Sequence, residues 1–207
     1  MAFPALQRLT AAEYLEIERA AETKHEFFNG EMVAMAGASP EHVLITANIT
    51  GALWAQLRRG PCRVYSVDLR VKVNDTGLYT YPDVVVVCGE PQFEAPRRDT
   101  LLNPTLIVEV LSSSTEAYDR GDKFAHYRRL ASLQEYVLIA QDRQRIERFV
   151  RHGESQEWLL TELSDPQGRL PLPSIGAELA MVEVYDKVEL PEGGIPLRQP
   201  ANDKVTG

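Results

Sequence analysis

An apolar run with a single acid inside it is the feature that most constrains this fold. The run Leu106–Leu111 reads Leu-Ile-Val-Glu-Val-Leu. Consecutive apolar residues of this kind are typical of a β-strand that is covered on both faces of its sheet. An ionised Glu109 is costly in such a strand unless a cation or hydrogen-bond donors receive it. The sequence therefore predicts a buried strand whose carboxylate has a partner.

A second apolar run, Tyr81–Cys88, carries one acid near its start, Asp83. We expect this run to form another core strand, and if the two strands are neighbours, Asp83 and Glu109 converge. Downstream, Asp119 and Lys123 are four residues apart in a predicted helix, so they share one helical face. Two acids on neighbouring strands, followed by a lysine on a helix, suggest a metal-dependent site that cleaves phosphodiesters.

The other elements follow from local signals. Thr10 and Glu13 fit a capping box that opens a helix over about residues 11–22. Asn29-Gly30 is typical of a tight hairpin turn, and Ser39-Pro40 begins a second helix that ends near Gly60. Further strands are expected at 67–73, 135–140, 145–150 and 157–162, with a long loop at 89–104 and a cap on the Lys123 helix at 112–115. The pattern predicts an α/β protein in which helices flank a mixed central sheet.

The length of 207 residues fits one domain, which we place at residues 1–190, followed by a disordered tail at 191–207. No apolar run approaches ~20 residues and the N-terminus lacks the pattern of a secretion signal, so we expect a cytoplasmic protein without membrane contact. Cys62 and Cys88 are then expected to be free, buried thiols, because a reducing cytosol disfavours disulfides.

The net charge of −8 argues against a protein that coats nucleic acid nonspecifically. Its distribution is uneven, because residues 119–151 contain eight Lys or Arg and five Asp or Glu. This basic segment could meet a polyanion or could be an ordinary solvated face. Charge leaves both interpretations open.

Each candidate residue also has a purely structural interpretation. Asp83 could belong to a turn, and Glu109 could form a structural ion pair with Arg70 or Lys123. Asp119 and Lys123 could be only a pair on the helix surface. Packing, capping or solvent-exposed roles are expected for His42, His25 and Tyr127.

An ordered series of short motifs resembles a known family. The series is Lys24-His25-Glu26, Asn29-Gly30-Glu31, Glu41-His42, Tyr81-Pro82-Asp83, Ile107–Ser112, Asp119 with Lys123 and Tyr127, and Glu135-Tyr136. It resembles the bacterial Uma-two family of restriction-endonuclease-like proteins over roughly residues 10–188. Within the series, Pro82-Asp83 with Glu109 is similar to the Pro-Asp…(Asp/Glu)-x-Lys signature of that nuclease superfamily.

The resemblance implies a restriction-endonuclease-like core with additional antiparallel strands, and an endonuclease that hydrolyses DNA with Mg²⁺ or Mn²⁺. It implies metal ligands at Asp83 and Glu109, with Glu26 as a third acid, and it is compatible with a homodimer. The superfamily lysine would stand two residues after Glu109, where this chain has Leu111, so the catalytic role is carried over to Lys123. Leu111 and the acidic charge motivate a second hypothesis, a nuclease-fold module with weak or no catalysis that binds nucleic acid or a protein partner.

Overall fold

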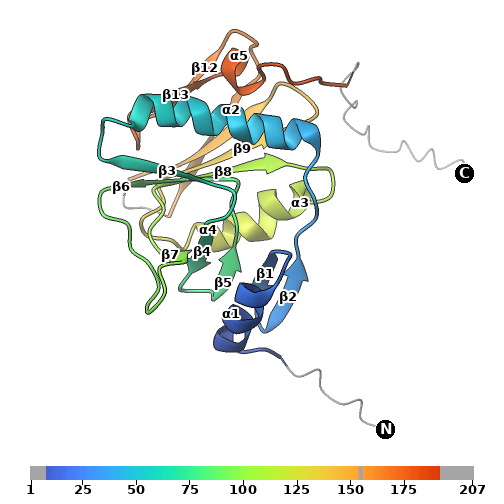
Figure 1. The fold of residues 1–207 in the computed structure, drawn as a ribbon. Coiled ribbons are helices and arrows are strands. Elements are labelled where there is room, and N and C mark those ends of the chain that lie inside the picture. Colours follow the sequence, from blue (N-terminus) through green and yellow to red (C-terminus); the bar gives the residue numbers. More distant parts are fainter. Residues whose placement is uncertain (1–7, 154–155, 192–207) are drawn as a thin grey trace, which may run out of the picture.

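The computed structural model describes residues 8–153 and 156–191, so the tail expected from 191 onward lies almost wholly outside the described residues. Within these residues, two main sheets and a small hairpin form the β-structure (Figure 1). The helical elements are α1 (Ala11–Ala20), α2 (Pro40–Leu57), α3 (Glu116–Tyr118), the π-helical turn η1 (Asp119–Lys123), α4 (Phe124–Tyr127) and α5 (Met181–Val184). The strands are β1 (His25–Phe28), β2 (Glu31–Ala34), β3 (Cys62–Ser66), β4 (Arg70–Val73), β5 (Leu78–Thr80), β6 (Val84–Cys88), β7 (Thr100–Leu101), β8 (Leu106–Leu111), β9 (Glu135–Ala140), β10 (Ile146–Arg151), β11 (Trp158–Leu163), β12 (Arg169–Leu172) and β13 (Ala177–Ala180).

The predicted starts of the first two helices are confirmed. Thr10 and Glu13 form a reciprocal capping box at the start of α1. Ser39 accepts a hydrogen bond from the backbone N–H of His42, and Pro40 occupies the first turn of α2. Asn29-Gly30 forms the predicted hairpin turn, with both residues at positive φ, between antiparallel β1 and β2.

The larger sheet has six strands in the order β11-β10-β9-β8-β6-β3, and only the β8–β9 pair is parallel. In Figure 1, α2 runs along one side of this sheet, and α3 and α4 lie on the other. Val108 and Val110 pack with the core under α2, whereas Ile107 and Leu111 pack with the core that contains Phe124 of α4. Because side chains alternate along a strand, Glu109 faces the same side as Ile107 and Leu111.

The second sheet has the order β2-β1-β5-β4-β7, and α1 packs on it through Tyr14, Phe27 and Tyr79. The chain leaves this sheet at Thr80 and enters the six-stranded sheet at Val84. The short link between these two residues contains Asp83, which therefore lies where the two sheets meet.

Three element predictions need correction. The strand expected from residue 67 begins only at Arg70, because Val67 has φ 45° and turns the chain before the strand. The loop expected at 89–104 contains the short strand β7, which pairs parallel with β4. The helix that carries Lys123 is not regular, because its central turn is the π-helix η1. At its start Thr115 makes no side-chain cap, and Ser112 instead accepts the backbone N–H of Thr115.

The prediction of free thiols at Cys62 and Cys88 is wrong. The two residues face each other in the register of antiparallel β3 and β6, with Cα atoms 4.0 Å apart, and they form a disulfide. The prediction of free thiols rested on the reducing conditions of the cytosol. The pairing of β3 with β6, however, decides that these two side chains meet. The disulfide closes the loop between β3 and β6 at the edge of the six-stranded sheet.

Candidate active site

The candidate site lies at the junction of the two sheets. Glu26 comes from β1 and Thr80 from β5, both in the five-stranded sheet. Glu109 comes from β8 of the six-stranded sheet, and Lys123 comes from η1, which packs against that strand's face. Residues from distant parts of the sequence thus meet only because both sheets are in place.

Asp83 and Glu109 lie beside each other, as the sequence predicted. β6 and β8 pair antiparallel with Val84 opposite Val108, so the next positions along the two strands are Asp83 and Glu109. The Asp83 Oδ2 accepts the backbone N–H of Val110 at 2.7 Å, and Oδ1 lies 2.9 Å from Nε2 of His42. The backbone carbonyl of Asp83 also accepts the N–H of Val67. Asp83 is therefore fixed from three directions.

The ammonium of Lys123 lies among three carboxylates. Its Nζ is 3.0 Å from Oε1 of Glu109, 3.1 Å from Oε1 of Glu26 and 3.3 Å from Oδ1 of Asp119. The Lys123 side chain is 7% exposed, and those of Glu109 and Asp119 are each 5% exposed. Because so little water screens these four ionisable groups, the protonation of each one depends on the charge of the others.

Two hydroxyl groups also donate hydrogen bonds to these acids. The Tyr127 hydroxyl donates to Oε1 of Glu109 at 2.8 Å, and the Thr80 hydroxyl donates to Oε1 of Glu26. Tyr127 also packs edge-on against Tyr136 of β9, with ring centroids 5.4 Å apart. Tyr127 thus combines a core position with a polar contact to the site.

Burial changes the protonation of this cluster. Removal from water raises the pKa of Glu109 to about 8, with Asp119 and Asp83 adding to the rise and Lys123 opposing it. Burial also raises the pKa of Asp119. Burial alone would lower the pKa of Lys123, but attraction by Glu109, Glu26 and Asp119 outweighs it and raises that pKa well above its ordinary value. The cluster holds more carboxylates than cations to balance them.

The structure decides between several of the interpretations left open by the sequence. Glu109 pairs with Lys123, while Arg70 instead bonds Tyr81 and Thr100. The helix pair of Asp119 and Lys123 exists but is buried, so its interpretation as a surface pair is wrong.

The histidines and hydroxyls also differ in how well the sequence predicted them. His42 reaches Asp83, beyond its expected capping role, while His25 pairs with Glu18 of α1. The expectation that His25 is exposed is wrong, since its side chain is 21% exposed. The sequence gives no chemical signal for Thr80 beyond its position just before Tyr81-Pro82-Asp83.

Among the described residues, no three His, Cys, Asp or Glu side chains are gathered closely enough to hold a metal ion by themselves. The contacts explain this arrangement. Glu26, Glu109 and Asp119 are directed at the ammonium of Lys123, and Asp83 is directed at His42 and at the backbone N–H of Val110 in β8.

No helix in the described part of the chain is long and apolar enough to cross a membrane.

The family model Uma2, described as "Putative restriction endonuclease", matches residues 11–182. This chain belongs to the Uma2 family. The match confirms the family resemblance carried by the motifs from Glu26 to Tyr136. Residues 11–182 of this chain, which the family model matches, include every residue of the candidate site.

Two cyanobacterial relatives of this Uma2 chain come from Synechocystis sp. (strain ATCC 27184 / PCC 6803 / Kazusa). The uncharacterized protein sll1609 is 41% identical over 155 residues, which cover 75% of this chain and 87% of the relative. The uncharacterized protein slr1290 is 36% identical over 178 residues, which cover 86% and 92%.

A solved structure shares the fold of this Uma2 protein. It is a crystal structure described as that of a "putative nuclease belonging to DUF820" from Anabaena variabilis ATCC 29413. The two chains superpose with a TM-score of 0.69 at 18% identity, over 86% of this chain and 97% of the other. At this identity the likeness establishes the fold, a mixed α/β nuclease-like architecture, and confirms the fold class expected from the sequence.

Proposed function

We propose that this protein is a divalent-metal-dependent endonuclease that hydrolyses phosphodiester bonds of DNA. The observation that carries the proposal is the placement of Asp83, just before β6, beside Glu109 in β8, with the buried ammonium of Lys123 against Glu109. Membership of a family described as restriction endonucleases supports the reaction class.

The donor set suits Mg²⁺ or Mn²⁺. These ions prefer oxygen ligands, and Mg²⁺ is usually held by one or two carboxylates, with water and substrate phosphates completing its shell. Asp83 and Glu109 supply the two carboxylates that such an ion needs. Glu26, whose Oε1 lies 3.1 Å from Nζ of Lys123, is the third acid near them. The raised pKa of Glu109 supports the same assignment, because a buried excess of carboxylates favours a further positive charge. When bound, the ion would polarise a phosphoryl oxygen and lower the pKa of a water.

The remaining residues have distinct roles in this proposal. His42 and the backbone N–H of Val110 orient Asp83, as outer partners of metal ligands commonly do. Tyr127 orients Glu109 through its hydroxyl. Lys123 supplies a positive charge that stabilises the charge developing on the phosphoryl oxygens, and Glu26 restrains that lysine.

A plasmid-nicking assay with Mg²⁺ or Mn²⁺ tests the proposal. Wild-type protein should convert supercoiled DNA to nicked and linear forms, and chelation with EDTA should stop the reaction. Asp83→Asn, Glu109→Gln and Lys123→Ala should each lower the rate by 10²-fold or more. Glu135→Gln is the matched control, because Glu135 is also a fully buried strand glutamate but lies on β9, outside the site. Equal background cleavage by wild type and all site variants would refute the proposal.

A second candidate function is a nuclease-fold module that binds nucleic acid or a protein without cutting. The observation that favours it is the pairing of three carboxylates with Lys123, together with Leu111 at the superfamily's lysine position. Titration calorimetry with Mn²⁺ separates the two functions. Metal binding that disappears in Asp83→Asn and Glu109→Gln supports the endonuclease. Salt-sensitive DNA binding without any metal binding supports the module.

A further inference from the structure

The outward face of α2 carries an apolar stripe. α2 buries Ile45, Ile49, Leu53 and Leu57 against the six-stranded sheet. On the opposite face, Val43 and Trp54 are 56% and 55% exposed, and the exposed Ala47 and Gly51 lie between them at helical spacing. Trp54 adds the largest apolar side chain of this stripe to the exposed surface.

A shallow groove runs beside this stripe, between α2 and α5. Ala47 and Gly51 form part of its floor, Val182 of α5 is 50% exposed beside them, and Glu183 and Asp186 add acidic groups to its lining. Trp54 stands two helical turns beyond Ala47, and the guanidinium of Arg58 lies 5.3 Å from the centre of its indole ring. One helix therefore presents both an aromatic ridge and a groove floored by small residues.

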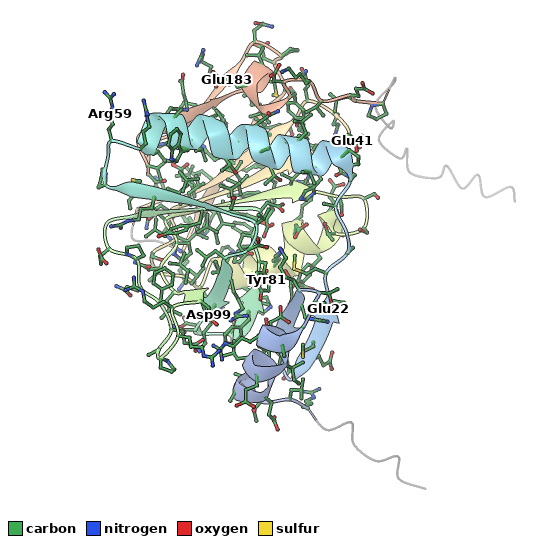
Figure 2. All side chains as sticks on the ribbon, viewed as in Figure 1. Glu22, Glu41, Arg59, Tyr81, Asp99 and Glu183 are labelled. Carbon is green, nitrogen blue, oxygen red and sulfur yellow. A yellow bond between two sulfur atoms is a disulfide. The ribbon has the colours of Figure 1, made fainter. Side chains whose placement is uncertain are left out.

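The two ends of α2 carry opposite charges. Figure 2 shows Glu41 at one end of α2, Arg59 at the other, and Glu183 above the helix. Arg58 and Arg59 are exposed at the C-terminal end of α2, whereas Glu41 belongs to its first turn. Two copies of α2 placed antiparallel bring ends of unlike charge together, and two placed parallel bring ends of like charge together. The antiparallel arrangement also aligns the helix dipoles favourably.

We propose that α2 binds the α2 of a second copy of this chain, antiparallel, about a two-fold axis near Thr50 and Gly51. In this arrangement, the ridge at Trp54 of each copy enters the groove at Ala47 of the other. The guanidinium of Arg58 then approaches the acidic Glu183. Small residues at the crossing let two helices approach to about 8 Å. The proposal is independent of the proposed function, because no metal or phosphodiester takes part in it.

The area of this face limits the expected affinity of the dimer. An 18-residue helix is ~27 Å long and about 10 Å wide, so each copy covers on the order of 300 Å². A standard interface covers about 800 Å² per partner. The dimer is therefore expected to be reversible, with a dissociation constant in the micromolar range.

Sedimentation velocity of the full chain from about 1 to 500 μM tests this, a range set by the expected micromolar affinity. The weight-average mass of wild type should rise from 23.2 kDa towards twice that value. Gly51→Arg and Trp54→Glu should hold the protein at the monomer mass. Gly51→Arg fits the fold, because a Cβ at Gly51 has no neighbour within 4 Å. Circular dichroism checks that each variant is folded.

Two further variants make the result decisive. Leu160→Glu changes an equally exposed residue on β11, outside α2, and should dimerise like wild type. Arg58→Glu should weaken the dimer at least tenfold, and adding Glu183→Arg should restore it. The proposal is overturned if wild type stays monomeric at every concentration, or if Leu160→Glu dissociates the dimer while Gly51→Arg does not.

Discussion

Replacing Lys123 by methionine should destabilise the fold strongly, because the ammonium balances three carboxylates that water barely reaches. Methionine keeps most of the side-chain volume, so the change removes the charge and little packing. Breaking a buried ion pair by removing one partner costs about 3–5 kcal/mol. We expect a loss near the lower bound, about 3 kcal/mol, because Tyr127 and Thr80 still donate to Glu109 and Glu26.

Urea unfolding followed by circular dichroism measures this loss, at a pH above the pKa of Glu109 of about 8 so that its carboxylate is ionised. With an m-value of about 2 kcal/mol per molar urea, a 3 kcal/mol loss moves the midpoint by roughly 1.5 M. Lys72→Met is the matched control. Lys72 pairs with the single carboxylate of Glu94 at a site where both side chains are over 20% exposed, so its loss should cost about 1 kcal/mol or less.

A double-mutant cycle with Glu109→Gln tests the cause. If the loss comes from an unbalanced Glu109, the combined variant should recover about 1–2 kcal/mol relative to the sum of the single changes. Mn²⁺ should also recover part of the loss, since it supplies the missing positive charge. A Lys123→Met protein within 1 kcal/mol of wild type would refute the reasoning, because the carboxylates would then not depend on the ammonium.

Three further predictions concern pH, redox state and His42. Asp99 bonds Arg19, which with a lesser effect of Arg70 lowers the pKa of Asp99 to about 2, so its stabilisation is complete above pH 3.8 and is lost as pH falls through 2. Since Asp99 is partly exposed, Asp99→Asn should cost about 1 kcal/mol at pH 7 in urea unfolding and clearly less at pH 2, where Asp99 is half protonated in the folded protein; an equal loss at both values would contradict this. Reduction of the Cys62–Cys88 disulfide removes a loop constraint worth about 3.5 kcal/mol, so dithiothreitol should lower the unfolding midpoint of wild type and leave a Cys62→Ser, Cys88→Ser variant unchanged. His42→Gln should weaken Mn²⁺ binding 10- to 100-fold by calorimetry, because Asp83 loses a partner that orients it; unchanged affinity would show that the backbone N–H of Val110 is sufficient.

Local signals predicted the elements well where one short-range rule decides the geometry. The capping box at Thr10 and the Asn29-Gly30 turn both occur as predicted. The apolar run with Glu109 inside it also forms the predicted buried strand. Each of these signals acts within a few residues, so the local conformation does not depend on contacts with distant elements.

The sequence could not predict features that depend on contacts between distant elements. The disulfide needs the register of β3 and β6, and the position of Thr80 beside Glu26 needs the pairing of β1 with β5. The sequence also placed Asp119 on the right helical face without revealing that the face is buried. The site's members were therefore predictable as candidates, while their contacts were not.

The short link from Thr80 to Val84 has a consequence for the order of events in folding. Glu26 and Glu109 stand on different sheets, and residues 81–83 connect those sheets covalently. An emerging chain that has made only the N-terminal sheet lacks Glu109 and Lys123, and β8 pairs on one side with β9, which is synthesised later still. The carboxylate cluster therefore cannot form before β8 and η1 have been synthesised, even if the N-terminal part of the other sheet is already in place. The proposed endonuclease activity would therefore begin only after strands of both sheets have come together.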